Sequence, residues 1–511
     1  MSSQELLAQE FGTLSDLVRA YAAERPAAAA LIHGDRRLTY GELDWLIDRV
    51  AAALQRDGVR PGDAVAIAAA ASLEYVVSFL GALRAGAAAA PLAPSSSPTS
   101  LRAMLADCGA KMLFADAEVA AAWDGDPPIQ RVGLDEASFV AWLAPPGAKP
   151  EPVAVVPDAP FNIIYSSGTT GVPKGIVQSH RMRWSHVSRG AAFGYGPDTV
   201  TLISTPLYSN TTLVSLLPTL AGGGTTVLME KFDAAKFLAL AERHRVTHAM
   251  LVPVQYKRLM EHPDFDRYDL ASFRMKFSTS APFAAALKAD ALKRWPGGLI
   301  EYYGLTEGGG TCALIAHEFP QKLHTVGRPL EGHEVRVIDE EGRELPPGST
   351  GEAVGRSPAM MNGYHNQPGK TAEMEWRDPS DKLFLRTGDI GRFDEDGFFV
   401  LVDRKKDMII SGGFNIYPSD IEAVLVRHDA VAEAAVVGVA SERWGETPVA
   451  FVVLKPGAAV AAEALRNWTN ERVGKTQRLA DLRIVASLPR SAIGKVLKRE
   501  LREQYSASAP A

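Results

Sequence analysis

The sequence predicts an α/β protein, with a large N-terminal domain made of α/β subdomains and a β-rich subdomain, and a small α+β domain at its C-terminal end. Two observations lead to this fold class. In the first part of the chain, apolar strand-like runs alternate with helical runs, which indicates a parallel sheet covered by helices. After about Gly327 the runs become short, alternating and separated by turn residues, which indicates antiparallel strands.

The first part of the chain carries clear helix and strand signals. "TYGE", from Thr39 to Glu42, is a capping box, because the threonine can cap a helix while the glutamate reaches back to its start. A helix is also expected over residues 73–84. Buried strands are expected at residues 64–70, 161–166, 225–230 and 248–253. Strands and helices thus alternate as in βα units.

The second part of the chain predicts strands first and a mixed domain afterwards. The segment "GRFDEDGFFVLVDRKKDMII" is expected to form two strands around an Asp-Gly turn. Beyond it we expect helices at residues 418–428 and 461–472 and strands at residues 434–439 and 448–454. We therefore predict an N-terminal domain at residues 1–403, a hinge at 404–406 and a C-terminal domain at 407–511.

Composition excludes several classes of protein. The chain has 511 residues, is 46% hydrophobic and 22% charged, and carries a net charge of -6, which gives no reason to expect nucleic acid or an anionic membrane as partner. Cys108 and Cys312 form no CxxC pair, so neither a disulfide framework nor a zinc site is indicated. The first residues lack the apolar core of a signal peptide, and the most apolar stretch, residues 75–94, is broken by Arg84, Gly86 and Pro91. We expect a cytoplasmic protein without a membrane span.

The segment "YSSGTTGVPKG", from Tyr165 to Gly175, follows an apolar strand. Glycines allow close backbone approach to an anion, the hydroxyl side chains add donors, and Lys174 adds a positive charge that suits phosphate. The pattern is no Walker A loop, because Pro173 precedes the lysine and Gly175 follows it. These residues alone fit a nucleotide-phosphate loop and a plain flexible turn equally well.

Four further segments, in order along nearly the whole chain, decide between these alternatives. They are "YYGLTE" from Tyr302, "LRTGD" from Leu385, "VDRKKDMIISGGFNIYPSDIE" from Val402 and "LPRSAIGKVLKRELRE" from Leu488. Together with the loop they resemble the motifs of the adenylate-forming superfamily, which comprises acyl- and aryl-CoA ligases, peptide-synthetase adenylation domains and luciferases. The hinge and terminal regions are most similar to those of benzoate-type aryl-CoA ligases.

The resemblance implies an acid–thiol ligase that uses ATP, Mg²⁺ and CoA. A carboxylate would attack the α-phosphate of ATP to give acyl-AMP and pyrophosphate, and a thiol would then displace AMP. The implied catalytic residues are Lys495 and Thr306, both at the α-phosphate, and Glu307, which is also the implied ligand of Mg²⁺. The implied nucleotide-binding residues are Ser166, Ser167, Gly168, Thr169, Thr170, Lys174, Tyr303, Gly304, Asp389 and Arg404.

Three of these residues also have a plainer interpretation. Thr306 would then cap a helix that begins at the "LTE" segment, Asp389 would form a turn in "TGD", and Lys495 would be a solvated surface lysine. These alternatives predict a helix after Thr306, a turn at Asp389 and an exposed side chain at Lys495.

The resemblance further implies that the small C-terminal domain is mobile and rotates about a hinge at Lys406 between the two steps. Gly412, Gly413 and Phe414 would then line a tunnel for the pantetheine arm, and Trp444 would stack on the adenine of CoA. A core position for Trp444 is the equal alternative.

The acyl pocket is the part in which this chain departs from the family. By family position it would be built from Ser209, Asn210, Thr211, Ser280, Ala281, Gly308 and Gly309. Ser209 stands where the family usually has histidine, and "STSAPF" is less glycine-rich than usual. The run from Gly308 to Gly310 leaves space, which favours an aromatic, arylpropenoyl or medium-chain acid over acetate.

The expected partners are a carboxylic acid, ATP and CoA, and the resemblance leaves room for a homodimer. Two other functions stay open. The chain could be a stand-alone adenylation enzyme that loads the thiol of a carrier protein, or a catalytically silent homologue that binds acyl-adenylate. A P-loop kinase is disfavoured by the failed Walker pattern.

Overall fold

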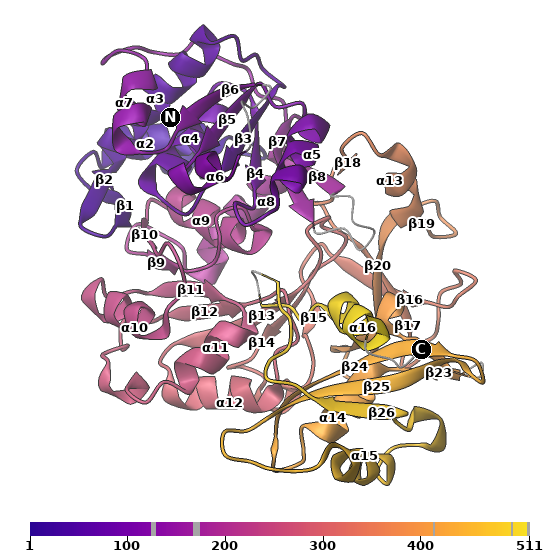
Figure 1. Cartoon of the computed structure of the whole chain (residues 1–511). Helices are drawn as coiled ribbons and strands as arrows, with labels where there is room; N and C mark the ends of the chain where they lie inside the picture. The colour runs from indigo at the N-terminus through magenta and orange to yellow at the C-terminus, as the bar shows by residue number, and fades with distance from the viewer. Residues whose placement is uncertain (124–128, 167–173, 412–413, 492–493, 508–511) are drawn as a thin grey trace. The chain divides into compact units, whose positions relative to one another are not determined.

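The computed structural model of the chain describes residues 1–123, 129–166, 174–411, 414–491 and 494–507. Two compact units are present. The first comprises Met1–Leu323, Pro329–Glu334 and Arg356–Leu385, and the second His324–Arg328, Val335–Gly355 and Arg386–Ala511. Both mix helices with sheets, as predicted (Figure 1). The predicted domain boundaries at 403 and 407 stay a prediction.

Two large sheets form the scaffold of the first unit. One has seven strands in the order β18-β8-β7-β4-β3-β5-β6, and the other nine in the order β15-β14-β13-β12-β11-β9-β10-β1-β2. The seven strands are β3 (Ala64–Ala68), β4 (Ala88–Leu92), β5 (Met112–Ala115), β6 (Gln130–Gly133), β7 (Pro160–Ser166), β8 (Lys174–Ser179) and β18 (Gly363–Tyr364). The nine are β1 (Ala29–His33), β2 (Arg36–Thr39), β9 (Val200–Ile203), β10 (Thr225–Leu228), β11 (His248–Leu251), β12 (Met275–Ser278), β13 (Gly298–Tyr303), β14 (Cys312–Ile315) and β15 (Arg328–Pro329).

The pairing in both sheets follows from the sequence pattern. Strands β3, β4, β5 and β6 pair in parallel, as do β1, β10, β9, β11, β12 and β13. Every residue of β3 is buried, which explains its continuous run of apolar residues, because helices cover both faces of a parallel sheet. Strand β8 pairs antiparallel with β7, and β14 with β13.

Helices of the first unit begin and end where the sequence signals them. The Thr39 side chain caps α3 (Tyr40–Arg56) and Glu42 reaches back, so the predicted capping box is confirmed. Helix α4 (Leu73–Arg84) matches its predicted bounds and is buried along its length, packed on α3. The remaining helices are α1 (Ser3–Leu7), α2 (Leu14–Glu24), α5 (Pro98–Cys108), α6 (Ala117–Ala122), α7 (Glu136–Trp142), α8 (His180–Ser188), α9 (Asn210–Ala221), α10 (Ala234–Arg243), α11 (Pro253–Met260), α12 (Ala285–Arg294) and α13 (Pro368–Met374).

Antiparallel strands dominate the later part of the chain, as predicted. One sheet has the order β16-β17-β20-β19, with β21 on β20, and the other β23-β22-β25-β24, with β26 on β25. Their bounds are β16 (Glu334–Ile338), β17 (Gly351–Arg356), β19 (Glu375–Arg377), β20 (Leu383–Phe393), β21 (Phe399–Arg404), β22 (Ile409–Ser411), β23 (Phe414–Ile416), β24 (Val431–Ser441), β25 (Gly445–Leu454) and β26 (Asp481–Ile484). Strands β20 and β21 flank the predicted Asp-Gly turn, where the Gly397 N–H donates to the Asp394 carbonyl.

Three helices accompany these strands: α14 (Pro418–Leu425), α15 (Ala462–Asn470) and α16 (Lys498–Ala507). Helix α14 ends three residues before the predicted position of 428, because the chain turns at His428, whose carbonyl accepts from the Val431 N–H, and enters β24. Helices α14 and α16 both pack on β24.

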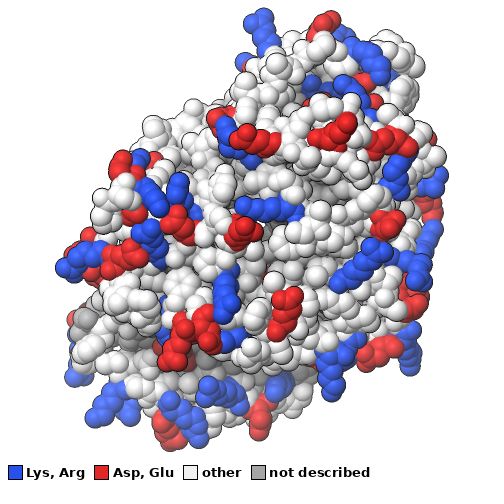
Figure 2. Space-filling view, turned by 180° about the vertical axis from the view of Figure 1, so that it is seen from behind, with Lys and Arg blue, Asp and Glu red and all other residues white. Residues whose placement is uncertain are grey.

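Acidic and basic side chains are interspersed over the molecular face shown in Figure 2. Within the described residues, no helix combines the length and the apolar character needed to cross a lipid bilayer.

Candidate active site

A tight turn at Thr306 and Glu307 follows β13 in the first unit. Gly308 and Gly310 after it have positive φ angles of 80° and 78°, and the chain then returns as β14 beside β13. Within the described chain, no helix begins between β13 and β14. The interpretation of Thr306 as a helix cap is therefore wrong, since the left-handed glycines turn the backbone back.

Three successive carbonyls of this turn accept hydrogen bonds from residues distant in sequence. The Gln178 Nε2 donates to the Thr306 carbonyl at 2.6 Å, the Met361 N–H to Glu307 at 2.9 Å, and the Ser357 Oγ to Gly308 at 2.6 Å. Residues 357–361 precede β18, which pairs with β8. The turn is thus tied to the same sheet that carries Lys174.

Tyr364 connects Lys174 and Glu307, the two candidate site residues that the sequence predicts here. Its hydroxyl donates to Glu307 Oε1 at 2.7 Å, and the Lys174 Nζ lies 5.1 Å from its ring centroid, in cation–π geometry. Burial, and then the Glu307 charge, raise the pKa of the tyrosine, so it stays a donor at neutral pH. Sequence reasoning missed Tyr364, because one aromatic residue in "NGYHN" carries no local signal of such a role.

The phosphate loop itself falls mostly outside the described residues. Ser167, Gly168, Thr169 and Thr170 belong to that segment, whereas the Ser166 backbone ends β7 and Lys174 begins β8. The two ends pair directly, residue 166 opposite residue 174. The phosphate-binding role of the loop therefore remains a prediction.

Glu307 is the predicted ligand of Mg²⁺. Within the described residues, no three His, Cys, Asp or Glu side chains are grouped as a metal cage. A single carboxylate nevertheless fits Mg²⁺, which commonly takes one or two protein carboxylates and completes its shell with water and substrate phosphates. The single Glu307 carboxylate therefore suits a magnesium ion that is bound together with the nucleotide phosphates.

The predicted acyl-pocket residues are only partly brought together. The Thr211 and Ser280 hydroxyls lie 2.6 Å apart, which joins two of the predicted segments, and Ser280 has an unusual positive φ of 79°. Ser209 caps α9, where its hydroxyl accepts from the Thr211 N–H at 3.3 Å. Asn210 begins the same helix, and Ala281 follows Ser280.

Gly308 has a different role from the one its sequence predicts. A Cβ at this position would lie 1.8 Å from the Ala359 carbonyl oxygen. The missing side chain lets the two backbones approach and leaves no room for an acid there. The space argument for a large acid therefore fails at Gly308, while Gly309 is buried beside it.

Tyr303 and Gly304 stand at the end of β13, before the turn. The tyrosine is buried and the glycine exposed. The predicted place of Tyr303 beside adenine and the predicted nucleotide-binding role of Gly304 stay predictions.

In the second unit, Asp389 lies within β20 and not in a turn, so that alternative is wrong. It is paired with Arg404 of β21, whose Nε lies 2.7 Å from the Asp389 Oδ1. Asp389 is only 3% exposed. The pair presents a fixed carboxylate next to a guanidinium, the donor and acceptor set that a ribose with its neighbouring phosphate requires.

Lys495 is half-buried and not fully solvated. Burial lowers its pKa to about 8, and the positive charges of Arg404 and Lys406 act in the same direction, while Asp389 and Asp407 oppose them. Burial also lowers the pKa of Lys406. A lysine of this kind is poised for an anion, because a bound phosphate would relieve the repulsion.

The predicted CoA residues divide into exposed and undescribed ones. Phe414 is 61% and Trp444 48% exposed, so Trp444 is no core residue. The Arg443 guanidinium lies 4.7 Å from the Trp444 ring centroid. Gly412 and Gly413 lie outside the described residues.

Comparison with known proteins places the chain in a family. The family model "AMP-binding enzyme" matches residues 18–365, and "AMP-binding enzyme C-terminal domain" matches residues 420–495. The chain belongs to the AMP-binding enzyme family. The expected membership of the adenylate-forming superfamily is thereby confirmed, and with it the class of AMP-forming acid–thiol ligases that use ATP.

Similar proteins cover almost the full length of this family member. A fatty acid–[acyl-carrier-protein] ligase of Streptomyces coeruleorubidus is 34% identical over 511 residues, which cover 96% of each chain. A feruloyl-CoA synthase of Amycolatopsis is 34% identical over 504 residues, with 94% of this chain and 96% of that one covered. The o-succinylbenzoate CoA synthetase of Bacillus subtilis, solved with its acyl-adenylate intermediate, aligns with a TM-score of 0.82 and 29% identity, covering 95% and 97%.

Proposed function

We propose that this enzyme activates an aromatic or medium-chain carboxylic acid as acyl-AMP and transfers the acyl group to CoA. The observation that carries the proposal is the arrangement of Lys174, Tyr364 and Glu307 beside the anchored Thr306 turn. It offers a phosphate-binding cation on β8 and a magnesium-binding carboxylate in a turn that is hydrogen-bonded to the same strand. Relatives named for feruloyl-CoA and o-succinylbenzoate-CoA synthesis support an aromatic acid.

In the first step, an oxygen of the substrate carboxylate forms a bond to the α-phosphorus of ATP, and the bond to the pyrophosphate oxygen breaks. Lys174, with the loop before it, would hold the pyrophosphate portion, and Thr306 would donate to the α-phosphate. Lys495 would supply the cation that neutralises charge as the new bond forms. A magnesium ion held by Glu307 would add further neutralisation of the phosphate oxygens.

In the second step, the CoA thiolate attacks the acyl carbonyl carbon, and AMP leaves with the electrons of the broken acyl–phosphate bond. Asp389 and Arg404 would hold the ribose through both steps. Rotation of residues 407–511 about Lys406 would replace Lys495 by the segment 411–415. We propose Trp444 as the stacking surface for the adenine of CoA, because 48% of its surface is exposed.

A carrier-protein thiol is the second candidate acceptor. A specific observation favours it, namely the 34% identity to a fatty acid–[acyl-carrier-protein] ligase. CoA and a carrier protein both present their thiol on a pantetheine arm, and an exposed aromatic residue could contact either arm. Only CoA carries an adenine, so stacking of Trp444 on adenine would distinguish CoA from the carrier protein.

The test is pyrophosphate release with Mg-ATP across benzoic, arylpropenoic and fatty acids, with CoA, with a holo-carrier protein or with no acceptor. We expect release with one acid class, increased several-fold by CoA with AMP accumulating. If only the carrier protein increases pyrophosphate release, the carrier protein and not CoA is the acceptor. Absence of release with every acid would contradict the proposed function.

A further inference from the structure

We propose that Gln178 is a positioning residue that holds the Thr306–Glu307 turn in register with Lys174, so that phosphate and metal contacts fall at their required spacing. The inference rests on the proposed adenylation function and adds a residue to it. Gln178 touches none of the reacting groups itself; it acts through the Thr306 carbonyl.

The contact is short and partly buried. The Gln178 side chain is 0% exposed, and its Nε2 lies 2.6 Å from the carbonyl oxygen of a residue 128 positions away. A hydrogen bond of this kind contributes about 0.5–1.5 kcal/mol, and at 2.6 Å it restricts where the turn can lie. The bond therefore connects the strand after the phosphate loop directly to the turn.

Gln178 and Lys174 share one strand and one face. Both belong to β8, and residues four apart in a strand point to the same side. Their Cα atoms are thus separated by about 13 Å of extended backbone, a length that does not stretch. Strand β8 therefore sets a fixed distance between Lys174, which we assign to the outer phosphates, and the turn that carries Thr306.

The amide of Gln178 is held from behind by two further buried residues. Its Oε1 accepts from the Asn162 Nδ2 at 2.9 Å and from the Arg183 guanidinium. The Arg183 Nε in turn donates to the Asn162 Oδ1 at 2.9 Å. This network fixes which end of the Gln178 amide faces Thr306, because the oxygen is already committed to donors.

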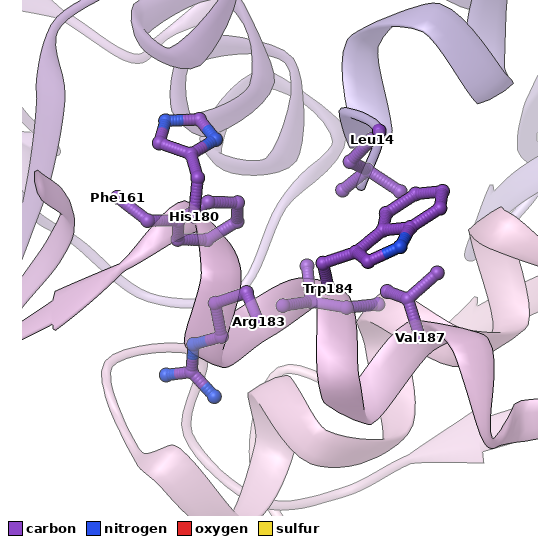
Figure 3. Close-up of a pocket in the computed structure, with 8 residues that line it drawn as sticks. Leu14, Phe161, His180, Arg183, Trp184 and Val187 are labelled. Atoms are coloured by element: carbon purple, nitrogen blue, oxygen red, sulfur yellow. The ribbon is translucent and has the colours of Figure 1, made fainter. Parts of the chain in front are cut away.

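Arg183 is itself unusual, because its hydrogen-bond partners are amide oxygens. Burial lowers its pKa to about 9, and in the described chain its Nη1 has no hydrogen-bond partner. Figure 3 shows the guanidinium directed away from the Trp184 indole, although both side chains leave α8. A cation bonded to the Gln178 oxygen polarises the amide and strengthens donation from its nitrogen, since linked hydrogen bonds reinforce one another.

A network of this kind could also serve stability alone, and Gln178→Glu separates the two roles. The carboxylate would pair with Arg183, which compensates the fold, whereas it cannot donate to the Thr306 carbonyl. A purely structural role predicts that any effect falls on stability, with the catalysis of the folded protein unchanged. The positioning role predicts a stable protein that forms acyl-AMP slowly.

The experiment compares wild type and Gln178→Glu in the two half-reactions. We expect the thermal midpoint to stay within a few degrees and adenylate formation to fall roughly 10- to 100-fold, as for a displaced reacting group. Thiolysis of supplied acyl-AMP should change less than about 3-fold on the same reasoning. Equal rates of adenylation in the two proteins, or an equal loss in both half-reactions, would overturn the inference.

Gln255→Glu is the matched control. Gln255 is also buried, at 6% exposed, and its Nε2 donates to the Ser204 carbonyl at 3.2 Å. We expect this variant to leave the ratio of the two half-reaction rates unchanged. A ratio that falls as in Gln178→Glu would show a general effect of buried carboxylates and would overturn the assignment to Gln178.

A binding readout separates failure of this inference from failure of the proposed function. If the wild type forms no adenylate with any acid, the proposed function fails, and ATP binding by calorimetry with and without Mg²⁺ still tests Gln178. We expect Mg²⁺ to strengthen ATP binding in the wild type and to do so several-fold less in Gln178→Glu. An equal gain in both proteins, or no ATP binding by the wild type, would overturn the inference.

Discussion

Lys495 carries a charge that its surroundings disfavour until an anion binds. Burial and the neighbouring Arg404 and Lys406 lower its pKa to about 8. Asp389, which opposes this effect, is committed to Arg404 at 2.7 Å. A phosphate bound next to Lys495 in the first half-reaction would therefore stabilise the charged form of the lysine.

Lys495→Ala should slow adenylate formation by about 10²-fold or more, as expected when one positioned transition-state cation is lost. Thiolysis of supplied acyl-AMP should be much less affected, because in the proposed mechanism the rotation about Lys406 has by then replaced Lys495 at the phosphate. Stopped-flow measurement of each half-reaction checks this. An equal loss in both would remove the assigned role.

The same group predicts a pH dependence. The ammonium form prevails below pH 8, so kcat/KM for ATP in the adenylation step should fall as pH rises through about 8. In Lys495→Arg the guanidinium stays protonated, and this basic limb should disappear even if the rate is lower. A pH profile of both proteins from 6 to 10 gives the comparison; the same limb in the arginine variant would assign it to another group.

Gly308 is required by backbone geometry. Gly308→Ala combines a φ of 80° with a Cβ 1.8 Å from a carbonyl oxygen, so we expect a loss of at least about 2 kcal/mol in the free energy of unfolding. Gly348→Ala is the control, since Gly348 has a φ of 84° but open space around it. In urea unfolding, the control should lose about 1 kcal/mol of the free energy of unfolding. Similar losses in both variants would mean that the positive φ, and not the contact with the carbonyl, causes the effect.

At the scale of elements, α12 is fixed to β13 by a buried ion pair. Lys288 of α12 contacts Glu301 of β13, and the Lys288 Nζ also donates to the Leu323 carbonyl at 2.7 Å. Both side chains are almost fully buried. Strand β13 leads directly into the Thr306 turn, so this pair supports the strand that presents the site.

Lys288→Met should lower the free energy of unfolding by about 3–5 kcal/mol, because it leaves the Glu301 carboxylate buried and unpaired. The double variant Lys288→Met/Glu301→Gln should recover part of that loss, since no uncompensated charge remains. Denaturant unfolding of the singles and the double forms a complete cycle. A double variant whose loss equals the sum of both singles would show that the two groups do not interact.

At the scale of the whole molecule, the hinge prediction concerns the short helical turn Lys405–Asp407 between β21 and β22. Asp407 is held by the Arg502 Nη2 at 2.9 Å, and the Lys405 Nζ by the Glu352 Oε2 at 2.9 Å. Lys406, between them, stays the predicted position of the backbone rotation.

Lys406→Pro should restrict that rotation because proline fixes φ. We expect thiolysis to slow by roughly 10-fold or more while adenylate formation stays within a few-fold, since closure steps often limit turnover. Lys406→Ala keeps the backbone free and serves as the control. If the proline variant performs both half-reactions like the alanine variant, the hinge lies elsewhere.

Much of the fold follows from local patterns. Strand β3, helix α4 and the Thr39 cap of α3 appear where periodicity and capping residues predict them, because these signals involve neighbours along the chain. The end of α14 was misplaced, since the turn into β24 depends on a pairing partner elsewhere in the sheet. Gly308 was interpreted as open space because its close neighbour, Ala359, is far away in sequence.

The sequence by itself determined the class of chemistry, because five short motifs in fixed order identify an adenylating enzyme whatever surrounds them. Only the tertiary structure decided which residues hold those motifs in place. Gln178 meets Thr306 across 128 positions and Tyr364 meets Glu307 across 57. Contacts at such separations arise from how sheets and turns pack. A hydrogen bond forms only when donor and acceptor meet at the right distance and angle, and a local sequence pattern does not predict which distant residues will do so.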